Sequence, residues 1–157
     1  KGIELAIELV HQLGDRRNRL VVSHEAGDEG LAYRDQLIAL AGEKAVDLRF
    51  LDPKAEGSPR LDELYHLADL VTFPSLFEGF GNALLEAVWF RKPVLVNRYS
   101  VFKSDIEPCG FEFVVIDGSI TGATMGSTSI SRPPTQRHLP RATRVGRKFL
   151  PLIVVNL

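Results

Sequence analysis

The sequence contains one cysteine, Cys109, in 157 residues. A single cysteine excludes an intramolecular disulfide and fits a reducing compartment, so a cytoplasmic location is expected. No Cys/His spacing typical of a zinc module is present. The apolar runs are also far shorter than the ~20 residues that a membrane-spanning helix needs. These absences exclude a disulfide scaffold and favour an ordinary globular domain.

Acidic residues are absent from the last part of the chain. All 20 acids lie in residues 1–117 together with 13 of the 19 bases, which gives this part a net charge of −7. Residues 118–157 carry six basic residues and a net charge of +6. The overall charge of −1 argues against a general nucleic-acid or membrane-surface binder. The split divides the chain into two segments of different composition.

Residues 1–117 show a regular alternation of helical and strand patterns. Helices are expected at 3–13, 31–41, 59–67 and 82–91, and strands at 19–23, 46–51, 69–73, 93–97 and 112–116. Runs such as LVTF and VLVN are continuously apolar, as in strands that helices cover on both faces. The alternation predicts an α/β fold, a Rossmann-like open parallel sheet with flanking helices. Ligands of such sheets bind at the carboxyl ends of the strands.

The stretch Phe73–Glu86, FPSLFEGFGNALLE, is the most informative part of the sequence. It leaves an expected strand, passes two glycines and enters a helix near Asn82. Glycine lets the backbone approach a ligand closely, and the first amides of a helix have no partner within it. Together with the helix dipole these amides form a site suited to phosphate.

Two carboxylates bracket this anion site. Glu78 lies in the loop, and Glu86 lies about one turn inside the helix, on the face of Asn82. Carboxylates repel phosphate but accept hydrogen bonds from hydroxyl groups. A ligand with phosphate in the middle and hydroxyls at both ends is a nucleotide sugar. Glu86 would then contact the ribose and Glu78 the sugar.

The same stretch resembles the signature of the family 4 retaining glycosyltransferases, which have the GT-B fold. Its two glutamates stand eight positions apart in EGFGNALLE, with ADLVTFPS before them and EAVWFRKPVLVN after them. The opening Lys1-Gly2 resembles the step that follows the first strand of that family's nucleotide-binding domain. The resemblance covers roughly residues 1–117. It implies the nucleotide-sugar-binding half of a GT-B fold, truncated at both ends.

The resemblance also implies roles for individual residues. Glu86 would bind the ribose hydroxyls, Glu78 would lie near the donor sugar, and Lys1 would neutralise the diphosphate as charge builds on it in the transition state. The family's accompanying arginine would lie upstream of Lys1. The loop that meets the sugar and the diphosphate would comprise Gly79, Phe80, Gly81, Asn82 and Ala83.

The implied activity is transfer of a hexosyl group from a nucleoside diphosphate sugar to an acceptor, with retention. No cofactor and no metal are expected, and neither is a nucleic-acid partner. An N-terminal acceptor domain would be missing, so the chain alone is expected to bind donor without turnover. Self-association through exposed apolar surface is a further expectation. Two alternatives remain: a related GT-B enzyme such as an epimerase or a phosphorylase-like relative, and a non-catalytic βα binding domain.

Other polar positions are less informative. The loop 24–30 contains His24, Glu25, Asp28 and Glu29, but its spacing matches no standard loop for Ca²⁺ or Mg²⁺. A solvated loop near the ligand cleft is the preferred interpretation. Asn97, Arg98 and Tyr99 follow an expected strand and are weaker candidates for contact with the donor or the partner domain.

Residues 118–157 form an atypical basic tail that does not continue the βα pattern. Residues 118–148 are rich in Gly, Ser, Thr and basic residues, and we expect them to be disordered. The final segment 149–157, FLPLIVVNL, either docks as a strand or forms an aggregation-prone end. An out-of-frame or otherwise non-native carboxyl end is favoured over a natural basic tail. At the other end, the chain begins at Lys1 without methionine, so upstream sequence is expected to be missing.

Overall fold

The computed structural model describes residues 2–23, 30–79, 81–117 and 152–155. Its helices are α1 (Ile3–Leu13), α2 (Leu31–Glu43), α3 (Leu61–Leu67) and α4 (Asn82–Trp89). Its strands are β1 (Arg19–Val22), β2 (Asp47–Phe50), β3 (Leu70–Phe73), β4 (Val94–Asn97), β5 (Val114–Ile116) and β6 (Leu152–Val155). A π-helical turn at Phe102–Ile106 and a 3₁₀ turn at Glu107–Cys109 precede β5. No helix among these residues is long and apolar enough to cross a membrane.

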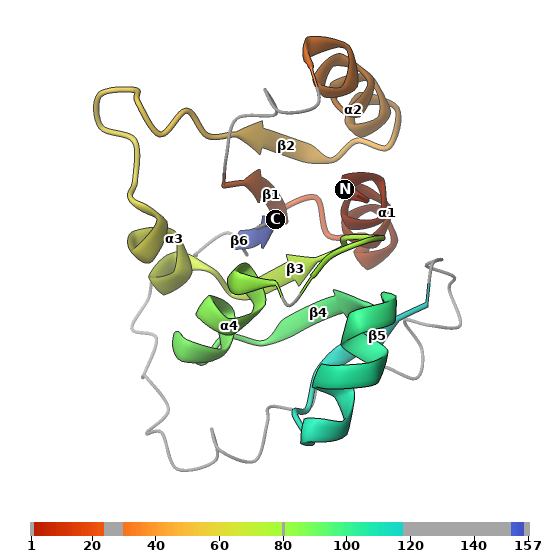
Figure 1. Ribbon diagram of the computed structural model, residues 1–157. Coiled ribbons are helices and arrows are strands. Elements are labelled where there is room, and N and C mark those ends of the chain that lie inside the picture. The colour runs from red at the N-terminus through yellow and green to blue at the C-terminus, as the bar shows by residue number, and fades with distance from the viewer. Residues whose placement is uncertain (1, 24–29, 80, 118–151, 156–157) are drawn as a thin grey trace.

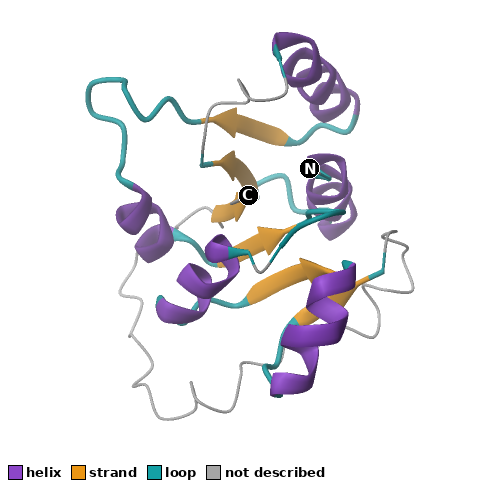
Figure 2. Cartoon of the chain, in the orientation of Figure 1, coloured by secondary structure: helices purple, strands orange, loops and turns teal. Residues whose placement is uncertain are grey.

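The strands form one open sheet in the order β2-β1-β6-β3-β4-β5, and every pairing is parallel (Figure 1). The α/β, Rossmann-like prediction is therefore confirmed. The five strands expected in residues 1–117 are all present, with ends that differ from the prediction by at most two residues. Figure 2 shows the helices alternating with the strands along the chain.

Side chains from alternate strand positions build a core on each face of the sheet. On one face Leu20, Leu95 and Ile153 pack with buried residues of α1 and α2. On the other face Val71 and Val154 pack with residues of α3, α4 and the turns before β5. Because both faces are covered, the strands need apolar residues at successive positions, and this explains their continuous apolar runs.

The turns between β4 and β5 differ from the sequence-based expectation, which placed only a loop there. Phe102 and Ile106 are both buried, at 1% and 4% exposed. They anchor the π-helical turn against the sheet. The segment is too short and too polar between these two residues for the helical pattern to be recognised in the sequence.

Strand β6 lies at the centre of the sheet although it comes from the end of the chain. It pairs with β1 on one side and β3 on the other, and β1 and β3 do not pair directly in the described part of the chain. Ile153, Val154 and Val155 are at most 3% exposed. Of the two alternatives for residues 149–157, the docked strand is thus observed at 152–155. The predictions for residues 118–148 lie outside the described residues.

The place of β6 follows from the way doubly wound sheets are built. In their common order, 3-2-1-4-5-6, the first strand lies in the middle and the chain then winds outward in both directions. Here α1 leads to β1, and β1 and β2 extend the sheet one way while β3, β4 and β5 extend it the other way. The central position is that of the first strand in this order, and β6 fills it in this structure.

Asp69 fixes the start of β6. Its backbone amide donates to Leu152 O (2.8 Å), and the Leu152 amide donates to Asp69 Oδ2 (3.1 Å). At the far end the Ser23 amide donates to Val155 O (3.1 Å). Hydrogen bonds at both ends therefore set the register of the strand.

Removal of β6 should unfold the domain. Burial of four apolar residues contributes about 6–10 kcal/mol, which is comparable with the whole stability of a typical domain. A chain that ends at Pro151 should lose cooperative thermal unfolding, measured by circular dichroism. A chain that ends at Val155 keeps the strand and should melt near the temperature of the full chain. Equal melting of both truncated chains would contradict the central role of β6.

Gly2 ties the start of α1 to the loop after β3. It is buried, its φ is 76°, and a Cβ built on it would collide with the carbonyl oxygen of Pro74. Only glycine fits both the left-handed backbone and this close approach.

Gly2→Ala should therefore destabilise the fold by about 2 kcal/mol, or roughly 4–8 °C in melting temperature. Gly14→Ala is the matched control. Gly14 has a similar φ of 67°, but the nearest atom to its Cβ would be Gln12 O at 4.0 Å. Gly14→Ala has the cost of a left-handed backbone but no collision. If both variants melt at the same temperature, the close approach of Gly2 to Pro74 does not contribute to stability.

Candidate functional site

The loops after β3 and β4 meet at the carboxyl edge of the sheet. All four residues of β3 are buried, and Pro74 and Ser75 continue the buried backbone. The Asn97 side chain, only 4% exposed, donates from Nδ2 to Ser75 O (3.0 Å). Asn97 thus supports the β3 loop from below.

The two residues after Asn97 also have structural contacts. The Arg98 guanidinium pairs with Glu107 at 2.8 Å. Tyr99 is 2% exposed, and its ring packs against Phe73 and Phe102. Burial, together with the nearby negative charge of Glu78, raises the pKa of Tyr99, so its hydroxyl stays protonated.

Gly81 forms the turn that starts α4. Its φ is 79°, and a Cβ built on it would lie 3.0 Å from the Phe73 ring and 3.2 Å from the Tyr99 hydroxyl. The backbone therefore rests directly on two aromatic side chains. Gly81 is the N-cap residue and has no side chain that could cap the first amides of the helix. Those amides point toward the carboxyl edge of the sheet, where an anion could use them.

A hollow of about 360 Å³ lies at this helix start. It brings together five residues that the sequence singled out, from both sides of the glycine turn. Its lining residues are Leu61, Phe73, Glu78, Gly81, Asn82, Ala83 and Glu86. Gly79 belongs to the same loop but does not line the hollow. Lys1 and Phe80, also predicted for the site, lie outside the described residues.

Glu86 is held by a hydrogen bond that the sequence did not indicate. The Tyr65 hydroxyl donates to Glu86 Oε2 at 3.0 Å and lies 3.2 Å from Ala83 O. Tyr65 is in α3, 21 positions earlier in the chain. In the sequence, the only indication of this contact was that Tyr65 follows Leu61 by four residues. On one helix that spacing places both side chains on the same face, here the face toward α4.

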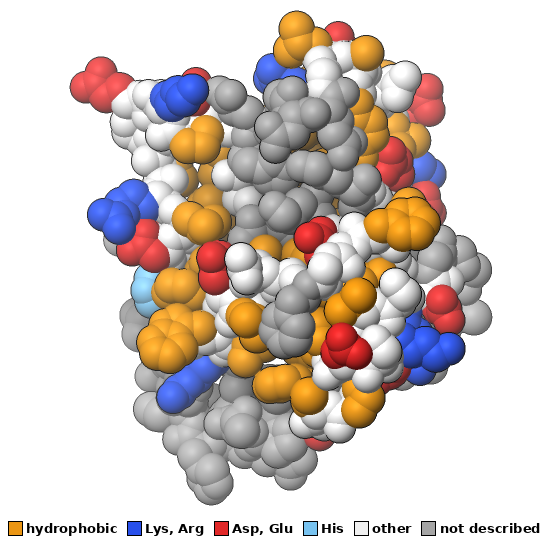
Figure 3. Space-filling view, viewed as in Figure 1, with side chains coloured by type: hydrophobic (Ala, Val, Ile, Leu, Met, Phe, Trp, Pro, Cys, Tyr) orange, Lys and Arg blue, Asp and Glu red, His pale blue; other side chains and the backbone are white. Residues whose placement is uncertain are grey.

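Both polar and apolar groups line the hollow. Glu78 and Glu86 place negative charge beside it, and Leu61 and Phe73 provide apolar walls. On the face seen in Figure 3, acidic side chains stand among hydrophobic ones. Such a mixture suits a ligand that carries hydroxyl groups and a flat or apolar part.

Several large hydrophobic side chains are exposed on the elements that carry the site. Phe77 is 89% exposed and Trp89 is 82% exposed; Leu67, Leu76 and Leu85 are also exposed. They belong to α3, α4 and the loop after β3.

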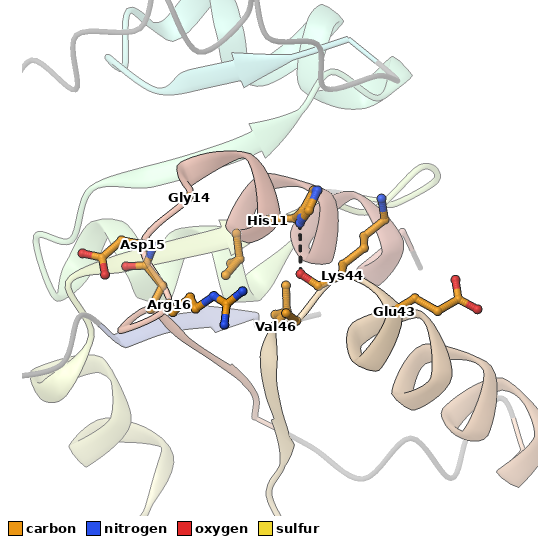
Figure 4. Close-up of a pocket in the computed structure, with 10 residues that line it drawn as sticks. His11, Gly14, Asp15, Arg16, Glu43, Lys44 and Val46 are labelled. Carbon is orange, nitrogen blue, oxygen red and sulfur yellow. Dashed lines mark hydrogen bonds between the residues drawn. The ribbon is translucent and has the colours of Figure 1, made fainter.

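A second hollow, of about 350 Å³, lies at the opposite edge of the sheet (Figure 4). It is formed where α1 and α2 end, just before β1 and β2 begin. His11 Nδ1 lies 3.0 Å from Lys44 O, a geometry in which the ring N–H donates, and Arg16 extends toward Val46 across the hollow. Ligands of parallel sheets bind at the carboxyl ends of the strands. This hollow lies at the other edge, so we interpret it as the space between the ends of α1 and α2 and not as the ligand site.

No cluster of three or more His, Cys, Asp or Glu side chains that could hold a metal ion occurs in the described part of the chain. Loop residues 24–29 lie outside that part. Cys109, the one cysteine, is exposed.

The family model described as "Glycosyl transferases group 1" matches residues 1–122. Among curated proteins, mannosylglucosylglycerate synthase of Thermotoga maritima is 38% identical over 130 residues, covering 73% of this chain and 30% of that protein. The protein of the same name from Petrotoga mobilis is 52% identical over 89 residues, covering 52% of this chain and 21% of that protein. D-inositol 3-phosphate glycosyltransferase of Nocardia farcinica is 36% identical over 95 residues, covering 59% and 21% of the two chains.

The chain thus spans less than a third of the length of these curated relatives. No solved structure gives a significant match. The match to the family model covers the sheet from α1 to β5 together with the glycine turn and both glutamates. The chain belongs to the group 1 family of glycosyl transferases.

Proposed function

We propose that residues 1–117 are the donor-binding half of a retaining hexosyltransferase. The substrate class is a nucleoside diphosphate sugar, and the reaction moves the hexosyl group to an acceptor and releases the nucleoside diphosphate. The observation that carries this proposal is the hollow at the start of α4, where Glu78 and Glu86 flank Gly81 in a chain of the glycosyl transferase family. The relatives, a mannosylglucosylglycerate synthase and a D-inositol 3-phosphate glycosyltransferase, support the same class.

Each part of the hollow suits one part of the donor. The first amides of α4 would bind the diphosphate, since the start of a helix offers backbone donors and the positive end of the helix dipole. Glu86, deeper along α4, would accept hydrogen bonds from the ribose hydroxyls. Glu78, in the loop, would accept them from the sugar.

Catalysis would come largely from stabilising charge on the departing diphosphate. In the transition state the bond between the anomeric carbon and the phosphate oxygen breaks, and negative charge builds on that oxygen. The amides at the helix start would stabilise this negative charge, and Lys1 would add a full positive charge. The acceptor hydroxyl oxygen would form its new bond on the same face of the anomeric carbon, which gives retention, and its proton would pass to the departing diphosphate oxygen.

The acceptor groups would come from a second, N-terminal domain that closes over this edge of the sheet. We therefore infer that the present chain binds donor without turnover. We also propose a cytoplasmic location. The exposed hydrophobic side chains, which include Phe77 and Trp89, would allow self-association.

Glu86→Ala should weaken nucleoside diphosphate binding about 10–100-fold, because the ribose hydroxyls lose a charged acceptor. Calorimetry with UDP, GDP and ADP on the 157-residue chain measures this. Glu43→Ala is the matched control, since Glu43 lines the hollow at the opposite edge. If the Glu43 variant loses binding and the Glu86 variant keeps it, the nucleotide binds at the opposite edge of the sheet and the proposed site is wrong.

Glu78→Ala should act on the sugar and not on the nucleotide. Binding of the free nucleoside diphosphate should be unchanged or slightly tighter, because an acidic group near the phosphates has gone. Binding of the intact donor, such as GDP-mannose or UDP-glucose, should weaken about tenfold. Equal losses for the nucleoside diphosphate and its sugar would contradict the proposed role of Glu78.

A further inference from the structure

We propose that Tyr65 is a positioning residue that holds the Glu86 carboxylate in the orientation needed to bind ribose. This inference rests on the proposed function, because it assigns a partner to the glutamate that would bind the nucleotide. Its basis is the hydrogen bond of 3.0 Å from the Tyr65 hydroxyl to Glu86 Oε2. Tyr65 is not part of the EGFGNALLE motif and lies on a different helix.

The Tyr65 side chain is fixed before any ligand binds. It is only 1% exposed, and its ring stacks on Phe90 with centroids 4.8 Å apart and planes inclined by 9°. The edge of the His66 ring meets the same Phe90 ring at 5.2 Å. The aromatic contacts therefore lock α3 to the end of α4, and the hydroxyl is presented from a rigid support.

Lys92 strengthens the same junction. Its Nζ donates to the carbonyl oxygens of His66 (3.0 Å) and Ala68 (2.9 Å), at the carboxyl end of α3. A cation is favourable there because the helix dipole is negative at this end. Burial lowers the pKa of Lys92, while the charge of Asp69 opposes this shift. The segment after α4 therefore clamps α3 in the position from which Tyr65 reaches Glu86.

One hydroxyl proton faces two acceptors, Glu86 Oε2 and Ala83 O. Both acceptors belong to α4, one turn apart, so either bond keeps the Tyr65 hydroxyl over the first turns of that helix. A carboxylate offers about four lone-pair sites on its two oxygens, so the bond from Tyr65 is compatible with a further bond from a ribose hydroxyl.

The choice of tyrosine has a chemical consequence. A glutamate side chain loses rotamer entropy when it is fixed, and a preformed orientation removes part of this cost from ligand binding. Arginine or lysine could hold the carboxylate as well, but would neutralise its charge. Tyrosine orients the group and adds no positive charge, so the Glu86 carboxylate is not neutralised and remains a charged acceptor for hydroxyl groups.

The test is Tyr65→Phe, which retains the ring and its stacking on Phe90. Calorimetry on the full 157-residue chain compares UDP, GDP and ADP with their 2′,3′-dideoxyribose forms. For the diphosphate that binds, the variant should bind the ribose form about fivefold more weakly and the dideoxyribose form within about twofold of the parent chain. Loss of discrimination between the two sugars is a readout that general loosening of the helix pair would not produce.

Tyr33→Phe is the matched control. The Tyr33 hydroxyl also donates to a glutamate, Glu4 Oε2 at 3.1 Å, but on the α1–α2 side of the molecule. This variant should bind both forms of the nucleotide like the parent chain. The double variant Tyr65→Phe/Glu86→Ala should bind no more weakly than Glu86→Ala alone, because Tyr65 acts only through Glu86.

The outcomes separate this inference from the proposed function. If Glu86→Ala loses ribose binding and Tyr65→Phe does not, the role of Tyr65 is wrong while the nucleotide site stands. If Tyr65→Phe weakens both nucleotide forms equally, Tyr65 is a packing residue and the inference also fails. If Glu86→Ala changes nothing, the proposed site itself is wrong and the role of Tyr65 fails with it.

Discussion

The structure depends on one strand that joins two half-sheets. β1 and β2 form one half and β3, β4 and β5 the other, and β6 is the strand that pairs with both. Its side chains enter the core on both faces: Ile153 and Val155 pack with α1 and α2, and Val154 packs with the cluster around α3 and α4. The candidate site requires both halves, because Gly2 at the start of α1 contacts Pro74 in the loop that leads to Glu78. A central strand is therefore a condition for the site as well as for the fold.

The fold of residues 1–117 could be predicted because local and global signals agree there. Helix α1 has one apolar face, and Gly14, a residue that commonly ends helices, follows its last residue in a left-handed conformation. The strands read as continuous apolar runs because helices cover both faces. The position of β6 could not be predicted from its own residues, since an apolar run of four to six residues fits a core strand or an aggregation-prone end equally well. Its place is set by the gap between β1 and β3, which only the assembled sheet defines.

The site was predictable to the extent that it lies in one stretch of sequence. The glycine turn and the two glutamates were found from their spacing, and the structure places both glutamates at one hollow. Tyr65 and Leu61 were missed because they come from another helix, and contacts between helices leave no fixed spacing in the sequence. The backbone conformation of Arg91 was likewise not predictable from the sequence. The residue has a φ of 54° just after α4, so the arginine adopts a left-handed conformation that a propensity rule would assign to glycine.

The charge distribution bears on how such a site could hold a diphosphate. Residues 1–117 carry a net charge of −7, and two of those charges, Glu78 and Glu86, lie at the hollow itself. The overall field of this part of the chain therefore opposes an anionic ligand, and attraction must come from groups within a few ångströms of the phosphates. The amides at the start of α4 are such groups, and Gly81 brings them close by resting directly on Phe73 and Tyr99. Under the proposed function the glutamates would select hydroxyl groups, and the backbone amides together with Lys1 would supply the affinity for phosphate. The two recognition tasks would thus fall to different chemical groups.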